Sequence, residues 1–151
     1  MDAKSQEAFL VFARPFIEAL KNVFETMVFT KVEASKPEMK KDNLSRGDVS
    51  SMIGMNGVYS LEGKDTEFKG MLVISWPNET YLKTASAMLM EEYTEYNDEI
   101  ADTGGEIVNM IMGNAKRDLA QVGYKLEMAI PSMIGGKDHT IRYPNGVQTV
   151  L

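Results

Sequence analysis

The clearest helical pattern near the beginning of the chain runs from Pro15 to about Met27. Apolar residues recur there every three or four positions with polar residues between them, which predicts a helix with one buried face. Pro15 suits the first turn of such a helix, where its missing N–H is not needed. The preceding apolar stretch, residues 8–12, fits either an extended segment or a further helical turn kinked at the proline.

Segments that read as strands follow this helix. Residues 29–33 form a short one, and the polar stretch 36–48 is expected to be a loop. Residues 52–61 and 68–76 flank a glycine-containing turn, which predicts an antiparallel hairpin whose last residue, a tryptophan, packs against the core.

A second helix is expected to begin after Pro77, with Asn78 as its N-cap. The polar run 91–97 ends it, and a long third helix is predicted from Asp98 to Gln121, before Gly123. The inward-facing stripe of the second helix is expected to contain Leu82, Ala85, Met88 and Leu89.

The chain after the third helix reads as strands again. Residues 124–134 alternate as a strand, Gly135-Gly136 makes a turn, and residues 139–143 and 146–151 are further short strands. The order of helix, strands, two helices and strands predicts an α+β fold, a mainly antiparallel sheet covered by long helices. A length of 151 residues predicts a single domain over residues 1–151.

The two faces of the predicted third helix differ in chemistry. At 100° per residue, Asp102, Glu106, Asn109 and Gly113 fall within roughly 60° of one another, on the side predicted to face solvent. Gly113 costs the helix about 1 kcal/mol relative to alanine and leaves a bare surface for another molecule to approach. The arc predicted to face the sheet contains Ile100, Gly104, Ile107, Val108, Ile111, Ala115, Leu119 and Val122.

Composition and charge narrow the range of functions. The sequence has no cysteine, which excludes disulfides, zinc–thiolate sites and a cysteine nucleophile. Its net charge of −6 and its scattered basic residues argue against nucleic-acid binding. Neither a signal peptide nor an apolar run of membrane-spanning length is visible, so a cytoplasmic protein without membrane contact is expected. His139, the only histidine, has no nucleophile arranged beside it in the sequence and is expected to be an ordinary turn or surface residue.

A glutamate and an asparagine three residues apart are, by themselves, most often solvated helix surface. The longer pattern Asp102-x-x-x-Glu106-x-x-Asn109, followed by Pro131, resembles the signature of the CheC/CheX/FliY phosphatase family. The stretch from residue 105 to residue 115, GEIVNMIMGNA, is most similar to the single-site CheX branch. Further similarities cover nearly the whole chain, at residues 15–19, 22–27, 70–74, 130–131 and 135–136.

The chain departs from the family pattern in two places. In CheC-like relatives the first helix can carry a second Glu-x-x-Asn, but here Glu18 is followed by Lys21 at the asparagine position, which predicts one site. Family members usually continue past the position of Val147 with one or two more strands, whereas this sequence ends at Leu151. Shortened C-terminal strands or a truncated chain would each explain this, and either weakens the homodimer through a sheet edge that the resemblance implies.

The resemblance implies hydrolysis of the aspartyl phosphate on a CheY-like response-regulator receiver domain. Such a mixed anhydride already reacts slowly with water, so the helper mainly has to hold a water in line with the phosphorus. A carboxamide can accept a hydrogen bond from that water and donate another nearby, which suits Asn109. As the resemblance implies, Glu106 would pair with the receiver's active-site lysine, while Asp102 and Gly113 would play supporting parts.

No cofactor of the chain's own is expected, and Mg²⁺ would belong to the partner receiver. Two other functions stay open at this point. A non-catalytic module of the same fold could bind a receiver or the flagellar switch. A small-molecule hydrolase would need a deep pocket with converging titratable groups, which nothing in the residue spacing indicates.

Overall fold

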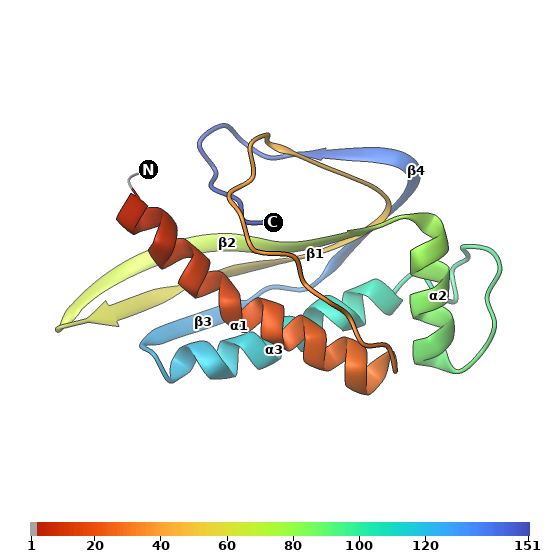
Figure 1. The fold of residues 1–151 in the computed structure, drawn as a ribbon, viewed down its shortest axis with the longest axis horizontal. Helices are drawn as coiled ribbons and strands as arrows, with labels where there is room; N and C mark the ends of the chain where they lie inside the picture. Colours follow the sequence, from red (N-terminus) through yellow and green to blue (C-terminus); the bar gives the residue numbers. More distant parts are fainter. Residues whose placement is uncertain (1–2) are drawn as a thin grey trace.

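A single antiparallel sheet organises the molecule, which the computed structural model describes for residues 3–151. Its central strand is β1 (Leu44–Leu61), which pairs along one edge with β2 (Lys64–Trp76). Along its other edge β1 pairs with β3 (Tyr124–Met128) and β4 (Ser132–Arg142), which lie end to end (Figure 1). The predicted hairpin is therefore confirmed, and β1 begins inside the stretch that was expected to be a loop.

Within residues 3–151, three helices accompany the sheet. Figure 1 shows α1 (Ala3–Met27) crossing α3 (Thr103–Ala120), with α2 (Asn78–Leu89) at one end of the sheet. The helix α3 contacts α1 as well as β1 and β3, so it lies at the centre of the packing. The predicted α+β class, with helices on a mainly antiparallel sheet, is confirmed.

The core lies between α1, α3 and the inner face of the sheet. Trp76 ends β2 as a buried side chain and meets Tyr81 edge to face, with ring centroids 5.3 Å apart. Burying each large apolar side chain contributes about 1.5–3 kcal/mol. The side chains that are almost completely buried include Val23, Val28, Val49, Ile53, Ile100, Ile107, Val108, Ile111, Met112, Leu119 and Leu126.

The first helix is longer than predicted, because α1 begins at Ala3 and continues through Pro15. The open question about residues 8–12 is thereby settled in favour of helix. An aromatic cluster supports this half of α1: the Phe12 ring centroid lies 5.6 Å from that of Phe68 on β2 and 5.1 Å from that of Tyr124 on β3. Tertiary packing of this kind readily outweighs one backbone hydrogen bond lost at a proline.

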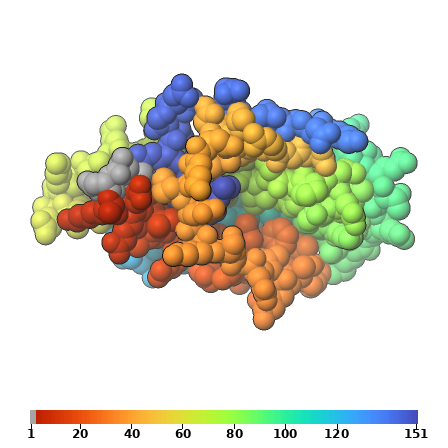
Figure 2. Space-filling view, turned by 45° about the horizontal axis from the view of Figure 1, so that its top comes forward, coloured from red at the N-terminus to blue at the C-terminus, as the bar shows by residue number. Residues whose placement is uncertain are grey.

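The segment after α1 is irregular, so the prediction of a strand at residues 29–33 is wrong. Phe29 has a φ of 56°, in the left-handed region, which ends any extended run. The segment crosses to the other end of the chain, where residues 38–40 exchange backbone hydrogen bonds with residues 149–151. Figure 2 shows these two parts, orange and dark blue, lying close together on one face. The strand predicted at residues 146–151 is thus reduced to one bridge, between Met39 and Val150.

The strand predicted at residues 124–134 is interrupted at residues 129–131. Met55 pairs with Met128, and Met52 pairs with Ser132, so two β1 residues oppose three residues of the neighbouring strand. One extra residue opposite a continuous strand is a β-bulge. Beyond it β4 pairs with β1 again, with a register shift at residues 136–138 opposite Asp48. The predicted turn at Gly135-Gly136 is wrong, because both glycines lie within β4.

Candidate functional site

The solvent-facing side of α3 carries the residues that the sequence singles out. Glu106, Asn109 and Gly113 are exposed on the helix, and Asp102 is exposed at the N-cap position just before it. A Cβ atom at Gly113 would meet nothing within 4 Å, so this part of the surface is open. The opposite face is buried as predicted, with one exception: Val122 lies beyond the end of α3 and is 61% exposed.

The helix begins later than the periodicity predicts. Residues 98–102 form turns, and the Asn97 carboxamide oxygen accepts hydrogen bonds from the backbone N–H groups of Glu99 and Ile100, at 3.0 and 3.3 Å. Asparagine readily stabilises a turn in this way, which competes with helix formation. Asp102 is the N-cap by position, but its side chain makes no capping hydrogen bond. Glu106 therefore lies in the first turn of α3, where a carboxylate interacts favourably with the helix dipole.

Tyr81, a residue that the sequence analysis missed, holds the first turn of α3. Its side chain is fully buried, and its hydroxyl donates to the Ile100 carbonyl oxygen at 2.7 Å and accepts from the Gly104 N–H at 3.1 Å. The Gly104 N–H is among the first amides of a helix, which lack partners within the helix itself. Burial raises the pKa of the Tyr81 phenol. A tyrosine on the inward stripe of α2 was the only signal in the sequence for this role.

Two glycines let α3 approach its neighbours closely at this end. A Cβ atom at Gly104 would lie 2.7 Å from the Met133 methyl carbon and 3.2 Å from Cε2 of Tyr81. A Cβ atom at Gly105 would lie 3.7 Å from Cβ of Pro131. The first turn of α3 is thus in contact with both α2 and the strand that follows the bulge, which fixes where Glu106 and Asn109 stand.

A carboxylate distant in sequence caps α2. Asn78 was predicted to be the N-cap, but it is the first helical residue, and its N–H donates to Oδ2 of Asp48 at 2.8 Å. Oδ1 of Asp48 accepts from the Asp138 N–H, also at 2.8 Å. These two hydrogen bonds, with the Asp138 bond the larger cause, hold the pKa of Asp48 below its usual value. Asp48 thereby joins β1, β4 and the start of the helix that carries Tyr81.

His139 is a structural residue of β4, which corrects the expectation of an ordinary turn residue. Its Nδ1 lies 2.8 Å from the Gly136 carbonyl oxygen and its Nε2 lies 2.7 Å from the Ser50 hydroxyl. Since a carbonyl can only accept, Nδ1 carries the proton and Nε2 accepts from Ser50 in the neutral ring. Ser50 is fully buried and also bonds Ser75, at 2.7 Å, so this serine is not accessible as a nucleophile.

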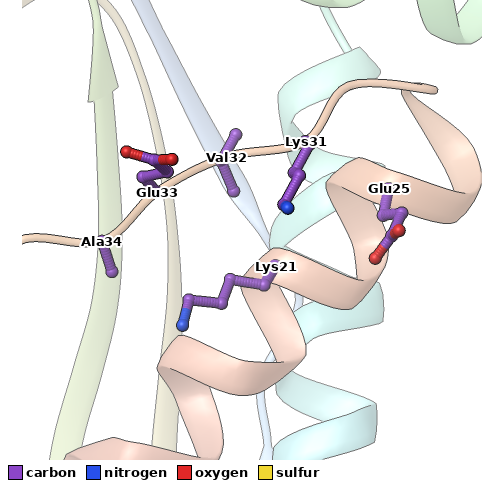
Figure 3. Close-up of a pocket in the computed structure, with 6 residues that line it drawn as sticks. All are labelled: Lys21, Glu25, Lys31, Val32, Glu33 and Ala34. Carbon is purple, nitrogen blue, oxygen red and sulfur yellow. The ribbon is translucent and has the colours of Figure 1, made fainter.

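The exposed side of α1 is occupied differently. Glu18 and Lys21 occupy the positions of a second Glu-x-x-Asn motif. Their side chains form an ion pair, with the Lys21 ammonium 3.4 Å from a carboxylate oxygen of Glu18. Lys21 also lines a shallow hollow of about 420 Å³ between α1 and the segment that follows it (Figure 3). The residues around this hollow are Lys21, Glu25, Lys31, Val32, Glu33 and Ala34.

Two surface hollows lie away from α3. A second hollow lies at the tip of the β1–β2 hairpin, and neither hollow is lined by α3. Residues 3–151 contain no group of three or more His, Asp or Glu side chains that could hold a metal ion. Within the same residues no helix is both long and apolar enough to cross a bilayer.

Comparison with known proteins identifies the family. Residues 49–151 match the family model described as "Chemotaxis phosphatase CheX". The chain belongs to the CheX family. The matched residues include most of β1 and all of β2, β3, β4, α2 and α3, and the resemblance found in the sequence is confirmed.

Individual relatives agree with the CheX assignment. The chain is 31% identical over 75 residues to the CheY-P phosphatase CheX of Thermotoga maritima; this match covers 49% of the chain and about half, 48%, of that relative. The crystal structure of the CheX protein from Vibrio vulnificus is 37% identical, with a TM-score of 0.78 over 92% of this chain and 87% of that one. A crystal structure of the CheX-CheY-BeF3-Mg²⁺ complex from Borrelia burgdorferi matches at 29% identity and a TM-score of 0.66, over 83% and 77% of the two chains.

Proposed function

We propose that this protein dephosphorylates the aspartyl phosphate of a CheY-like receiver domain. The observation that carries the proposal is the exposed face of α3, where Glu106 and Asn109 stand one turn apart on a helix whose opposite side is buried in the core. Membership of the CheX family supports it, and so does a CheX relative that was crystallised together with a CheY. An open helix face suits a protein substrate better than a small molecule, which would need a pocket.

Asn109 is the group that acts on the attacking water. Its side-chain carbonyl accepts a hydrogen bond from the water and aligns the water oxygen with the phosphorus. The new P–O bond forms as the bond to the receiver's aspartate breaks, which releases the carboxylate and inorganic phosphate, and the water's proton passes to the phosphate or to solvent. Holding the water in place removes much of the entropic cost of the step.

Glu106 fixes the register of docking. Its carboxylate pairs with the receiver's active-site lysine, and such a charge-assisted contact is strong once the interface excludes water. Asp102, one turn earlier, supports the negative potential on this face, and Gly113, one turn beyond Asn109, leaves room for the receiver backbone. The receiver would supply Mg²⁺, which neutralises charge on the phosphoryl group.

Several parts of the assignment stay predictions: the single domain over residues 1–151, the cytoplasmic location and the homodimer. The outer edges of β2, β3 and β4 pair with no other named strand in residues 3–151, so the sheet has edges on which a second copy could add. Light scattering of the purified protein would test the homodimer.

The proposal is tested by the decay of a phosphorylated receiver from the same organism. We expect the intact protein to speed this decay and the Asn109→Ala variant to lose about a hundredfold or more of the rate while it still binds the receiver. Asn22→Ala is the matched control, because Asn22 is an exposed asparagine on α1. If the intact protein binds receivers but never speeds the loss of their phosphoryl group, the protein is instead a non-catalytic docking module.

A further inference from the structure

Ile130 is the most exposed large apolar side chain among residues 3–151, at 87%. A single exposed isoleucine is common on protein surfaces and means little without a position. Its position here is unusual, because it lies in the β-bulge at residues 129–131, beside the first half of α3.

Two contacts locate Ile130 along α3. Near one end of the bulged strand, Lys116 of α3 lies 3.8 Å from Glu127 of β3. Near the other end, Pro131 lies against Gly105. The helix therefore runs antiparallel to residues 127–131, and interpolation between the two contacts places Ile130 level with about residue 108. Ile130 is thus within about 2 Å of Asn109 along the helix axis.

The same contacts decide on which side of α3 Ile130 lies. Gly105 is four residues before Asn109 and Lys116 is seven residues after it, so all three occupy one stripe of the helix surface. Both contacts to the bulged strand come from this stripe. Ile130 therefore flanks Asn109 on the side of α3 that faces residues 127–131.

The bulge explains why an isoleucine is exposed at this point. Two residues of β1 oppose three of the neighbouring strand, so one residue cannot continue the regular alternation of the sheet. Pro131 has no N–H to offer to the ladder, and its ring contacts α3. Bulges commonly redirect a side chain next to an active site.

We propose that Ile130 is a docking residue for the receiver domain, which buries this side chain under an apolar part of its own surface beside the phosphorylated aspartate. The inference rests on the proposed function and extends it to substrate recognition. If a second copy of this chain bound at Ile130, it would cover Asn109 and block the proposed site. The partner that binds at Ile130 is therefore the receiver. Burial of Ile130 also excludes bulk water from the flank of the water that Asn109 holds.

The test measures receiver decay over a range of phosphorylated-receiver concentrations with Ile130→Ala, Ile130→Val and a control, Leu61→Ala. Leu61 is also an exposed aliphatic side chain, at 57%, but it lies at the hairpin tip and not beside α3. We expect Ile130→Ala to raise KM about tenfold and to leave kcat within about twofold, with Ile130→Val close to the intact protein and Leu61→Ala unchanged. The melting temperature of Ile130→Ala should stay the same, because the side chain is solvent-exposed.

An unchanged KM for Ile130→Ala would overturn the inference, as would a loss of melting temperature or a change in oligomeric mass without receiver. Binding of a beryllofluoride-loaded receiver separates this inference from the proposed function. If the intact protein binds the receiver but does not speed decay, the phosphatase proposal fails, and a weaker Kd for Ile130→Ala would still support docking through Ile130. If the intact protein binds no receiver, both are overturned.

Discussion

The helices α1 and α3 pack against each other, and each has an exposed glutamate followed three residues later by a polar side chain. On α1 the two are Glu18 and Lys21, which pair with each other at 3.4 Å beside a shallow hollow lined by further charges. On α3 they are Glu106 and Asn109, and beyond them Gly113 leaves the surface open. The two side chains on α1 bind each other, whereas the two on α3 are exposed to solvent.

The contacts that hold the exposed faces of α1 and α3 in place differ as well. The first turn of α3 is held by the Tyr81 hydroxyl, by the close approach at Gly104 and by Pro131 against Gly105. The exposed side of α1 next to Lys21 faces an irregular segment instead. A short motif therefore becomes a candidate site only where packing fixes its side chains in place.

Removal of the two glutamates should give the largest contrast between the helices. Glu106→Ala should lower kcat/KM about a hundredfold or more, because the receiver lysine would be left without its partner in a desolvated contact. Glu18→Ala should change kcat/KM by less than about twofold, since its exposed pair contributes little. Receiver-decay assays measure both, and equal losses in the two variants would contradict the distinction between the faces.

A side chain at Gly113 should separate stability from docking. Gly113→Ala should stabilise the protein by up to about 1 kcal/mol, because alanine favours helix and the added Cβ meets no atom within 4 Å. Gly113→Leu should fold equally well but raise KM about tenfold, because it obstructs the approaching receiver. Urea unfolding and decay kinetics on the same samples test this, and a normal KM for Gly113→Leu would show that the receiver does not approach there.

Loss of the Tyr81 hydroxyl should weaken α3 from within. Tyr81→Phe leaves the Gly104 N–H and the Ile100 carbonyl without this partner, which should cost about 1–3 kcal/mol of unfolding free energy. We expect kcat to fall severalfold as the first turn of α3 loosens. The matched control is Tyr93→Phe, because the Tyr93 hydroxyl meets exposed carboxylates, Glu91 at 3.2 Å and Glu99, instead of the backbone of α3. Similar losses in the two variants would contradict the role of Tyr81.

Lowering the pH should reduce the stability of the protein through Asp48. The hydrogen bonds of this carboxylate join β1, β4 and the start of α2, the helix that carries Tyr81. The folded-state pKa of Asp48 is lowered by hydrogen bonds from Asp138 and Asn78. Its contribution to stability is therefore present above the unfolded-state pKa, about 4, and is lost as the pH falls through the lower folded value. Asp48→Asn should flatten this part of the pH profile of urea unfolding. An unaltered profile would contradict the assignment.

The smallest effect is expected from completing the motif on α1. Lys21→Asn creates a Glu-x-x-Asn there, but the receiver-decay rate should change by less than about twofold, because nothing in the surroundings of α1 reproduces those of α3. The decisive sample is the double variant Lys21→Asn with Asn109→Ala, which should stay inactive. Recovery of activity in that protein would mean that the motif alone is sufficient.

The sequence by itself determined which faces of α3 are buried and exposed, because a helix repeats every 3.6 residues and local spacing sorts its side chains. The same holds for the β1–β2 hairpin, whose turn and flanking strands are neighbours in the chain. The central pair of the resemblance to the CheC/CheX/FliY family, Glu106 and Asn109, also lies close together on one helix.

Only the tertiary structure decided the rest, because it depends on residues far apart in the chain. Asp48 caps α2 across thirty residues, and Tyr81 holds the start of α3 across twenty-three. The aromatic cluster around Phe12 makes α1 continue through its proline, and the bulge that exposes Ile130 exists only when β3 and β4 are set against β1. Local periodicity records none of these contacts, since each forms only when the sheet and helices have packed together.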